Sequence, residues 1–479
     1  MPADEVSSET LASTLLVCTP SPTPDHKAPD TQGLELVAMR TFYFISDLHI
    51  GGDEALGVCD FEPELIGFLE MLAAKQDEDV ELVIVGDAFG LWEFTQVEGN
   101  KKVDVLIGQF PRIFAAFKSA GEKIRITLLP GNHDYELACY PEFVGLFASY
   151  NIHLEQTSSV TRDLDTRRLW IEHGNQHDAA NRMPDYGNPH AQPFGYFVTS
   201  NIVGSAGQLS ERGRYNWLKD IQSVYPTEEL PAWFVSNYFY REMSPLLRWV
   251  LLPFLVFFGL TIFVLIGSLL DWTNVTNSNI FLNNQLFESL GVAGSLLQLV
   301  LTVNAVLLVE ALILAIPVFF ILRDVKASAR RFGLVMDPAQ LTGDKDDAYL
   351  EAAERIFESD PEVAVFIYGH THAPFVKRVG ERAVVNTGTW IKKLESVKTR
   401  VGLLPRIYLP SYRLTYFRVH ETDGEVIIEH NKVAKTPARE LSLVQRLLAS
   451  RPRPSKEGPI PQQTKVGPAA IAKQASASG

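Results

Sequence analysis

Residues 126–134 read ITLLPGNHD, a short apolar run closed by Pro-Gly and followed at once by polar side chains. Runs of this length, rich in β-formers and ended by Pro or Gly, are typical of buried strands. Four more runs end in the same way, with Asp or His directly after the apolar positions. They are FYFISDLH (42–49), LVIVGD (82–87), LWIEHG (169–174) and VAVFIYGHTH (363–372).

The segments between the first three runs have the apolar spacing of amphipathic helices, near Glu62–Ala74 and Val105–Ala120. Strands that alternate with helices predict an α/β domain with a parallel sheet. Toward the end of the chain, Tyr412–Val419 and Glu425–Glu429, joined through Asp423-Gly424, predict a β-hairpin. Because the carboxyl ends of parallel strands meet at one edge, the polar residues after the five runs are expected to converge.

Seven side chains of metal-ligating type would meet at this edge. Imidazole with carboxyl or amide oxygen, and no thiolate, suits divalent Mn, Fe, Zn or Co. Seven ligands exceed the need of one ion and suit a pair about 3.5–4 Å apart, the arrangement used for displacement at phosphorus. The seven are Asp47, His49, Asp87, Asn132, His173, His370 and His372.

The apolar residues of this chain, 46% of its 479 positions, are concentrated in two runs. Trp249–Leu270 carries no charge, and the strongly polar positions in Ser295–Leu322 are Gln298, Asn304 and Glu310. At about 1.5 Å per residue, each run is long enough to cross the hydrocarbon core of a bilayer as a helix. We therefore predict a transmembrane hairpin. A carboxylate within its second helix is costly, so Glu310 is a functional contact, an oligomer contact or protonated.

Basic residues flank the predicted hairpin, whereas the segment between its helices, 271–294, has no Lys or Arg. The positive-inside rule then places both flanks and both termini in the cytoplasm, at the inner (cell) membrane. The flanking residues are Arg241, Arg248, Arg323, Lys326, Arg330 and Arg331.

The two ends of the chain differ in charge from its body. Residues 1–38 carry a net charge of −5 without the basic start of a signal peptide, and residues 432–479 carry +7. Both are predicted to be mostly disordered, with one short helix near Glu440–Ser450. The basic tail either contacts an anionic membrane or is simply solvated. The predicted divisions are 1–38, a first domain part at 39–240, the hairpin at 241–330, a second part at 331–433 and the tail at 434–479.

The five motifs resemble the signatures of the calcineurin-like metallophosphoesterases over about 39–240 and 340–433. They are Asp47-x-His49, Gly86-Asp87, Gly131-Asn132-His133-Asp134, His173-Gly174 and Gly369-His370-Thr371-His372. The resemblance implies a four-layer α/β/β/α sandwich, here with the two-helix transmembrane hairpin inserted, and a dinuclear centre.

The same resemblance implies roles for individual residues. Asp47, His49 and His372 would bind one metal. Asn132, His173 and His370 would bind the other. Asp87 would bridge the two, and His133, oriented by Asp134, would stabilise the transferring phosphoryl group or protonate the leaving oxygen.

Within this family, 86–92 and 369–374 look most like the UDP-2,3-diacylglucosamine pyrophosphohydrolases, which act at the cytoplasmic membrane face. That branch carries a helical lid where this chain has its hairpin. It also has Arg where His133 stands, and 175–182 differs, which points to a sister group. Four residues in this stretch either line the phosphate side of the pocket or form an ordinary polar loop: His177, Asp178, Asn181 and Arg182.

The predicted function is hydrolysis of a phosphoester or pyrophosphate, on a lipid-linked or nucleotide-sugar substrate, with two divalent ions (Mn first, then Fe, Zn or Co). The alternatives are a nucleotide phosphodiesterase or nuclease, and a non-catalytic membrane scaffold or sensor. A net charge of −14, and of −16 over 39–431, disfavours nucleic acid as the partner. The complete ligand set disfavours the scaffold. The sequence leaves the oligomeric state open.

Overall fold

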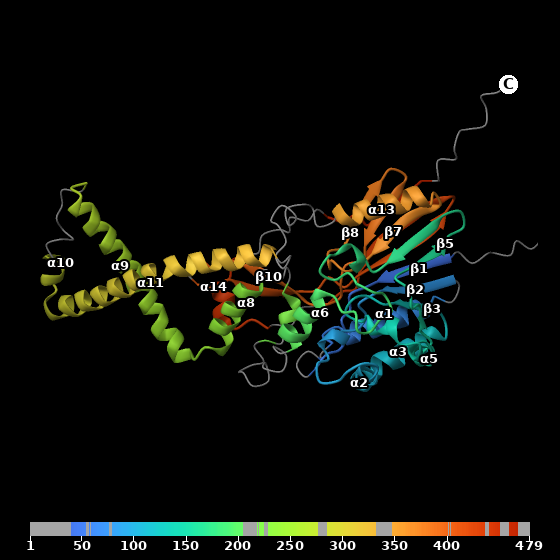
Figure 1. The fold of residues 1–479 in the computed structure, drawn as a ribbon, viewed down its shortest axis with the longest axis horizontal. Helices are drawn as coiled ribbons and strands as arrows, with labels where there is room; N and C mark the ends of the chain where they lie inside the picture. Colours follow the sequence, from blue (N-terminus) through green and yellow to red (C-terminus); the bar gives the residue numbers. More distant parts are fainter. Residues whose placement is uncertain are drawn as a thin grey trace, which may run out of the picture. The chain divides into compact units, whose positions relative to one another are not determined.

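The computed structural model describes residues 40–53, 57, 59–75, 79–204, 218, 220–224, 229–275, 285–331, 347–400, 402, 404–435, 440–450 and 459–467. Figure 1 shows the fold. The segment 1–38, predicted to be disordered, lies outside the described residues, as do 451–458 and 468–479 of the tail.

A seven-stranded sheet has the order β14-β13-β12-β1-β2-β3-β4, in which β1, β2, β3 and β4 run parallel. The predicted hairpin is confirmed as β12 and β13, which turn at Asp423 and Gly424, both with positive φ. The strands are β1 (Arg40–Ile45), β2 (Asp79–Val85), β3 (Arg125–Leu129), β4 (His153–Leu154), β12 (Thr415–Thr422), β13 (Glu425–Lys432) and β14 (Gln463–Val466).

A five-stranded sheet has the order β5-β6-β7-β9-β8, with β6, β7 and β9 parallel and the outer two strands antiparallel to their neighbours. A third, two-stranded sheet pairs β10 with β11. These strands are β5 (Ser159–Asp163), β6 (Arg168–Glu172), β7 (Val363–Tyr368), β8 (Phe375–Val379), β9 (Arg382–Asn386), β10 (Lys393–Val397) and β11 (Ile407–Ser411).

The single helix predicted for Val105–Ala120 is wrong. Two helices meet there at Phe110, α2 (Lys101–Gln109) and α3 (Pro111–Gly121). Pro111 has no N–H to donate, and its ring would clash with the carbonyl four residues earlier in a continuous helix. The Phe110 N–H still bonds the Leu106 carbonyl and closes α2, and the proline then starts α3 at the position where it is tolerated.

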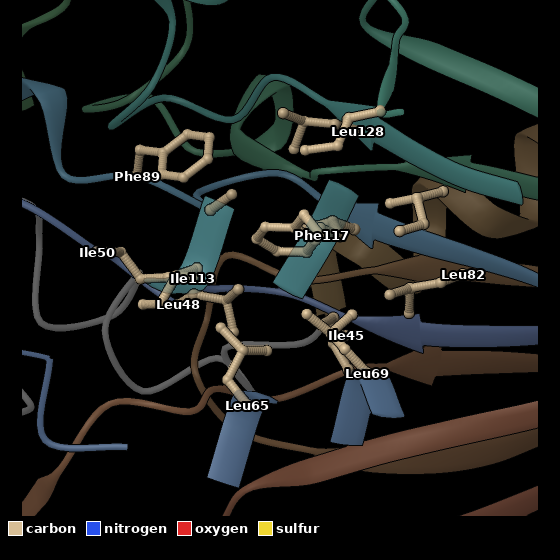
Figure 2. Packing of buried hydrophobic residues seen from close by; sticks show 14 of the residues in the cluster. Ile45, Leu48, Ile50, Leu65, Leu69, Leu82, Phe89, Ile113, Phe117 and Leu128 are labelled. Atoms are coloured by element: carbon tan, nitrogen blue, oxygen red, sulfur yellow. The ribbon is translucent and has the colours of Figure 1, made fainter. Parts of the chain in front are cut away.

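Helices cover both outer faces of the paired sheets. Figure 2 shows β1–β3 packing on α1 (Glu62–Ala73) and α3 through Ile45, Leu82, Leu128, Leu65, Leu69, Ile113 and Phe117. The opposite face of these strands packs on the second sheet through Phe44, Val83, Val85, Ile171, Val365 and Val385. The far face of that sheet packs on α13 (Asp347–Ser359) through Phe366, Tyr368, Ala353 and Phe357. The order through the domain is therefore helices, sheet, sheet, helix.

Both runs predicted to form the hairpin are helical, as α9 (Pro245–Trp272) and α11 (Gly291–Arg331), with the short α10 (Gln285–Glu288) between them. The two long helices contact each other. In the part of the chain that the structure describes, one stretch is long and apolar enough to cross a membrane, Gly291–Ile321, with a mean hydropathy of 2.6. The apolar stretch found in α9, Val256–Trp272, is shorter.

The described part of the tail contains a helix and a strand. The short helix expected near Glu440–Ser450 is present as α14 (Leu443–Leu448). Beyond it, β14 joins β13 in four antiparallel pairs, from Val426–Val466 to Glu429–Gln463. This part of the tail is ordered because its backbone pairs with the edge of the sheet.

Candidate metal centre

The loops that follow β1, β2, β3, β6 and β7 bring all seven predicted ligands together. A first cluster holds Asp47, His49 and His372, whose ligand atoms all lie within 4.8 Å of one another. The Nε2 atoms of the two histidines are 3.1 Å apart, and Asp47 Oδ1 lies 3.2 Å from His372 Nε2. Three donors from two different sheets therefore face one small volume.

A second cluster holds Asp87, His173 and His370, with the same limit on the distances between ligand atoms. His173 Nε2 lies 3.2 Å from Asp87 Oδ2 and 3.2 Å from the side-chain oxygen of Asn132. Asp87 Oδ2 is also 3.7 Å from His49 Nε2 of the first cluster. Asp87 thus lies between the two clusters.

The backbone at this site is held in an unfavourable conformation. Of eight non-glycine residues with positive φ in the described part of the chain, five are Asp47, His49, Asp87, His370 and His372. Side chains rarely adopt this region, and such strain concentrates where surrounding structure enforces a functional geometry. Close approach adds a further constraint, since a Cβ at Gly131 would come within 2.2 Å of Asp87 Oδ1.

Neighbouring groups fix how the ligands point. The His173 ring is 2.9 Å from the Val85 carbonyl through Nδ1, which as donor leaves Nε2 to face Asp87 and Asn132. Asp47 Oδ2 accepts hydrogen bonds from the Ser46 hydroxyl and from the His370 backbone N–H. Such outer contacts hold metal ligands in register and select the imidazole tautomer.

The electrostatics of the clusters favour a bound cation. Burial by itself raises the pKa of Asp47, but hydrogen bonds and charges from His372 and His49 hold it well below its usual range. Burial also raises the pKa of Asp87, and the His173 and His133 charges lower it further than burial raises it. Asp47 Oδ1 is buried and lies 3.2 Å from His372 Nε2. A buried carboxylate oxygen beside imidazole nitrogens fits a divalent ion.

His133 is held by Glu93 rather than by Asp134. Its Nδ1 lies 2.9 Å from Glu93 Oε1, and its ring packs against Trp92. Burial by itself lowers the pKa of His133, but the charges of Glu93 and Asp87 outweigh burial and raise this pKa to about 9. Both carboxylates thus favour the protonated form of His133.

The orienting role predicted for Asp134 is wrong. Its carboxylate accepts hydrogen bonds from the backbone N–H groups of Gly131 (2.6 Å) and Phe89 (3.1 Å), so it ties two of the site loops together. Burial and the Asp87 charge raise the pKa of Asp134 to about 7. Glu93 was not predicted, although it lies in the short turn η2 (Leu91–Glu93) only six residues after Asp87. A carboxylate so soon after Asp87 is the sequence feature that could have indicated its place in the site.

The four suggested substrate residues separate into two groups. Asp178 Oδ2 is 3.0 Å from His370 Nε2 and accepts a hydrogen bond from the Asn181 amide, so this pair contacts the second cluster. His177 Nε2 instead lies 2.6 Å from Glu172 Oε1, and Arg182 is exposed. The polar-loop interpretation describes His177 best.

Residues 40–265 match the model of the calcineurin-like phosphoesterase family, and the chain accordingly contains a calcineurin-like metallophosphoesterase domain. This domain indicates metal-dependent hydrolysis of a phosphorylated substrate. The match includes four of the five motifs, and the structure adds the fifth, with His370 and His372.

Two solved structures align with most of the chain. A conserved uncharacterised protein from Streptococcus pneumoniae TIGR4, a predicted phosphoesterase, is 10% identical, covers 84% of this chain and 95% of its own, and has a TM-score of 0.26. A single mutant of Vps29 from Entamoeba histolytica is 10% identical, covers 81% and 91%, and has a TM-score of 0.26. No curated protein matches the sequence.

Proposed function

We propose that this protein is a membrane-anchored phosphohydrolase that uses two divalent metal ions to cleave a phosphoester or pyrophosphate bond. The observation that carries the proposal is the pair of adjoining clusters, built from five loops of two sheets, with Asp87 between them. A chance gathering of polar residues would not be expected to combine buried carboxylates, imidazoles and positive φ at the same positions.

In this proposal, Asp47, His49 and His372 would hold one ion. Asn132, His173 and His370 would hold the other. Asp87 would serve both, because its Oδ2 faces histidines of both clusters. Bound ions of this kind stabilise charge on phosphoryl oxygens and activate water at neutral pH, and Mn²⁺, Fe, Zn²⁺ and Co²⁺ all suit these donors.

The chain itself supplies the acid. Glu93 fixes His133 and favours its protonated form, so His133 would donate to a leaving oxygen or hydrogen-bond a phosphoryl oxygen. Its ring lies 4.6 Å from the ring of His49, centre to centre. Asp178 and Asn181, beside His370, would contact the substrate, and the exposed Arg182 would bind a second phosphate group.

Membrane anchoring by α9 and α11 is supported by the 31-residue apolar stretch of α11 and by the basic flanks, which favour a cytoplasmic domain at the inner membrane. A substrate that is lipid-linked or a nucleotide sugar fits this placement and the similarity of 86–92 and 369–374 to the UDP-2,3-diacylglucosamine pyrophosphohydrolases.

The test is a screen of the purified full-length protein with Mn²⁺ against lipid pyrophosphates, nucleotide sugars, nucleotides, simple phosphodiesters and oligonucleotides, with and without chelator. Asp87→Asn protein purified in parallel is the control for contaminating enzymes. We expect chelator-sensitive turnover of a pyrophosphate or lipid-linked substrate in the unsubstituted protein alone. Preference for oligonucleotides would favour a nuclease, and no turnover on any substrate would favour a scaffold.

A further inference from the structure

Helix α14 has the reverse of the usual burial pattern. Its capping box is formed by Ser442 and Gln445, and the Gln445 side chain is turned inward, with 4% of the residue exposed. Leu443 and Leu447 are 72% and 71% exposed, and Val444 between them is also exposed. A surface helix normally buries its leucines and exposes its amides.

This exposure does not result from a loosely attached helix. Leu441, Leu448 and Ala449 pack against a small cluster that contains Tyr240 and Ile407. Backbone hydrogen bonds from Arg400 to Leu448 and from Ser450 to Lys398 fasten the end of the helix to the loop after β10. The apolar ridge of Leu443, Val444 and Leu447 is therefore held outward.

The cluster that holds α14 also holds the chain where the hairpin begins. Tyr240 lies in the turn η8 (Tyr238–Glu242), directly before α9. Its carbonyl accepts a hydrogen bond from Arg248 in the first turns of α9, where Leu246 and Leu247 are exposed. The outward ridge of α14 is thus attached to the point at which the chain would enter the membrane.

The sequence that contains α14 is basic. Residues 432–479 carry a net charge of +7 on a chain whose remaining body is acidic, and Arg446 on α14 itself is exposed. Leucines beside basic residues are the composition of a helix that lies in the surface of an anionic bilayer.

We propose that α14 is a second membrane contact, lying in the lipid headgroup region with Leu443, Val444 and Leu447 directed toward the acyl chains. The proposal rests on the proposed anchoring by α9 and α11. A second contact would restrict rotation of the domain about the hairpin, which the hairpin alone would not.

The test uses the full-length protein in vesicles of phosphatidylcholine with phosphatidylglycerol. An environment-sensitive fluorophore is attached at Leu447→Cys, at Leu443→Cys, at Leu314→Cys on α11, or at Val144→Cys on α5 (Glu142–Ala148), after Cys18, Cys59 and Cys139 are replaced by Ala. We expect labels on α14 to shift to shorter wavelength and to lose at least about half of their intensity to a shallow doxyl lipid. The α14 signal should weaken without phosphatidylglycerol, and the Val144 label should not respond.

If the Leu314 label is quenched and both α14 labels are not, the α14 proposal is overturned and the hairpin stands. If none is quenched, anchoring fails as well, although chelator-sensitive hydrolysis, measured on the same samples, would still support the enzyme. A spectral shift on α14 without lipid quenching would indicate a protein contact and would also overturn the proposal.

Discussion

The candidate metal clusters and the hairpin both depart from the usual burial of side chains. The clusters bury charged groups, whereas the hairpin exposes apolar ones. At the strand ends, the carboxylates of Asp47 and Asp87 are buried. Along α11, large apolar residues such as Leu312 are exposed. Each departure costs free energy in water, so each marks a place where something outside the chain completes the structure. We infer cations at the first and lipid at the second. Binding of a cation depends on single ligand atoms, whereas contact with lipid depends on the composition of a whole helix. Single substitutions should therefore affect the metal clusters far more than the hairpin.

Removal of one ligand should have the largest effect. His173→Ala should abolish measurable turnover, since changes to outer contacts of metal sites alone cost about 10–100-fold. Bound metal per chain, measured by plasma mass spectrometry, should fall with it. His153→Ala, at a half-exposed position on β4, is the control and should change neither quantity. If the His173→Ala variant keeps its full metal content and activity, His173 is not a metal ligand.

Loss of the acid should cost less and should leave the metals in place. His133→Ala should lower kcat by about 10²–10⁴-fold, the usual contribution of a positioned proton donor. Metal content should stay at the level of the unsubstituted protein. The effect should shrink for substrates with good leaving groups, because these need no proton. An equal loss on all substrates would indicate a structural role for His133.

Glu93→Gln should have a smaller effect, about 10-fold to 100-fold on kcat, as for other residues that orient a catalytic group. The carboxylate stabilises the protonated form of His133, whose pKa is raised to about 9. Its removal lowers that pKa, and protonated His133 is then lost at lower pH. The alkaline limb of kcat/KM against pH should therefore move to lower pH. Glu136→Gln, a buried carboxylate paired with Lys102 instead, should leave the profile unmoved.

Replacement of 245–331 by a flexible Gly/Ser linker should have the smallest effect on catalysis. Turnover of a water-soluble substrate should change by no more than about threefold, because 245–331 contains none of the candidate ligands and sites that share no partners act independently. Fractionation should nevertheless find the protein in the soluble rather than the membrane fraction. Loss of activity toward a soluble substrate, in a variant with an unchanged circular dichroism spectrum, would contradict the division of the molecule into these two regions.

The sequence located the seven candidate ligands better than the elements around them. Each of these residues follows a strand, so locating the strand also located the residue. Glu93 was missed because it contacts another side chain, that of His133, and follows no strand. Pro111 is a signal for a helix boundary, but the apolar spacing on both sides of it suggested one continuous helix. β14 is four residues long and gains its order from pairing with distant β13, which no local pattern reveals.

The strands of the five-stranded sheet are separated in the sequence by the hairpin, so they are synthesised at different times. β6 leaves the ribosome before α9 and α11, and its partner β7 leaves after them. Each ligand cluster lacks a histidine until 370–372 emerges, several seconds after the end of α11 at about 5–20 residues per second. On the proposed function, the hairpin reaches the lipid while neither cluster is complete. Insertion into the membrane then precedes the acquisition of metal.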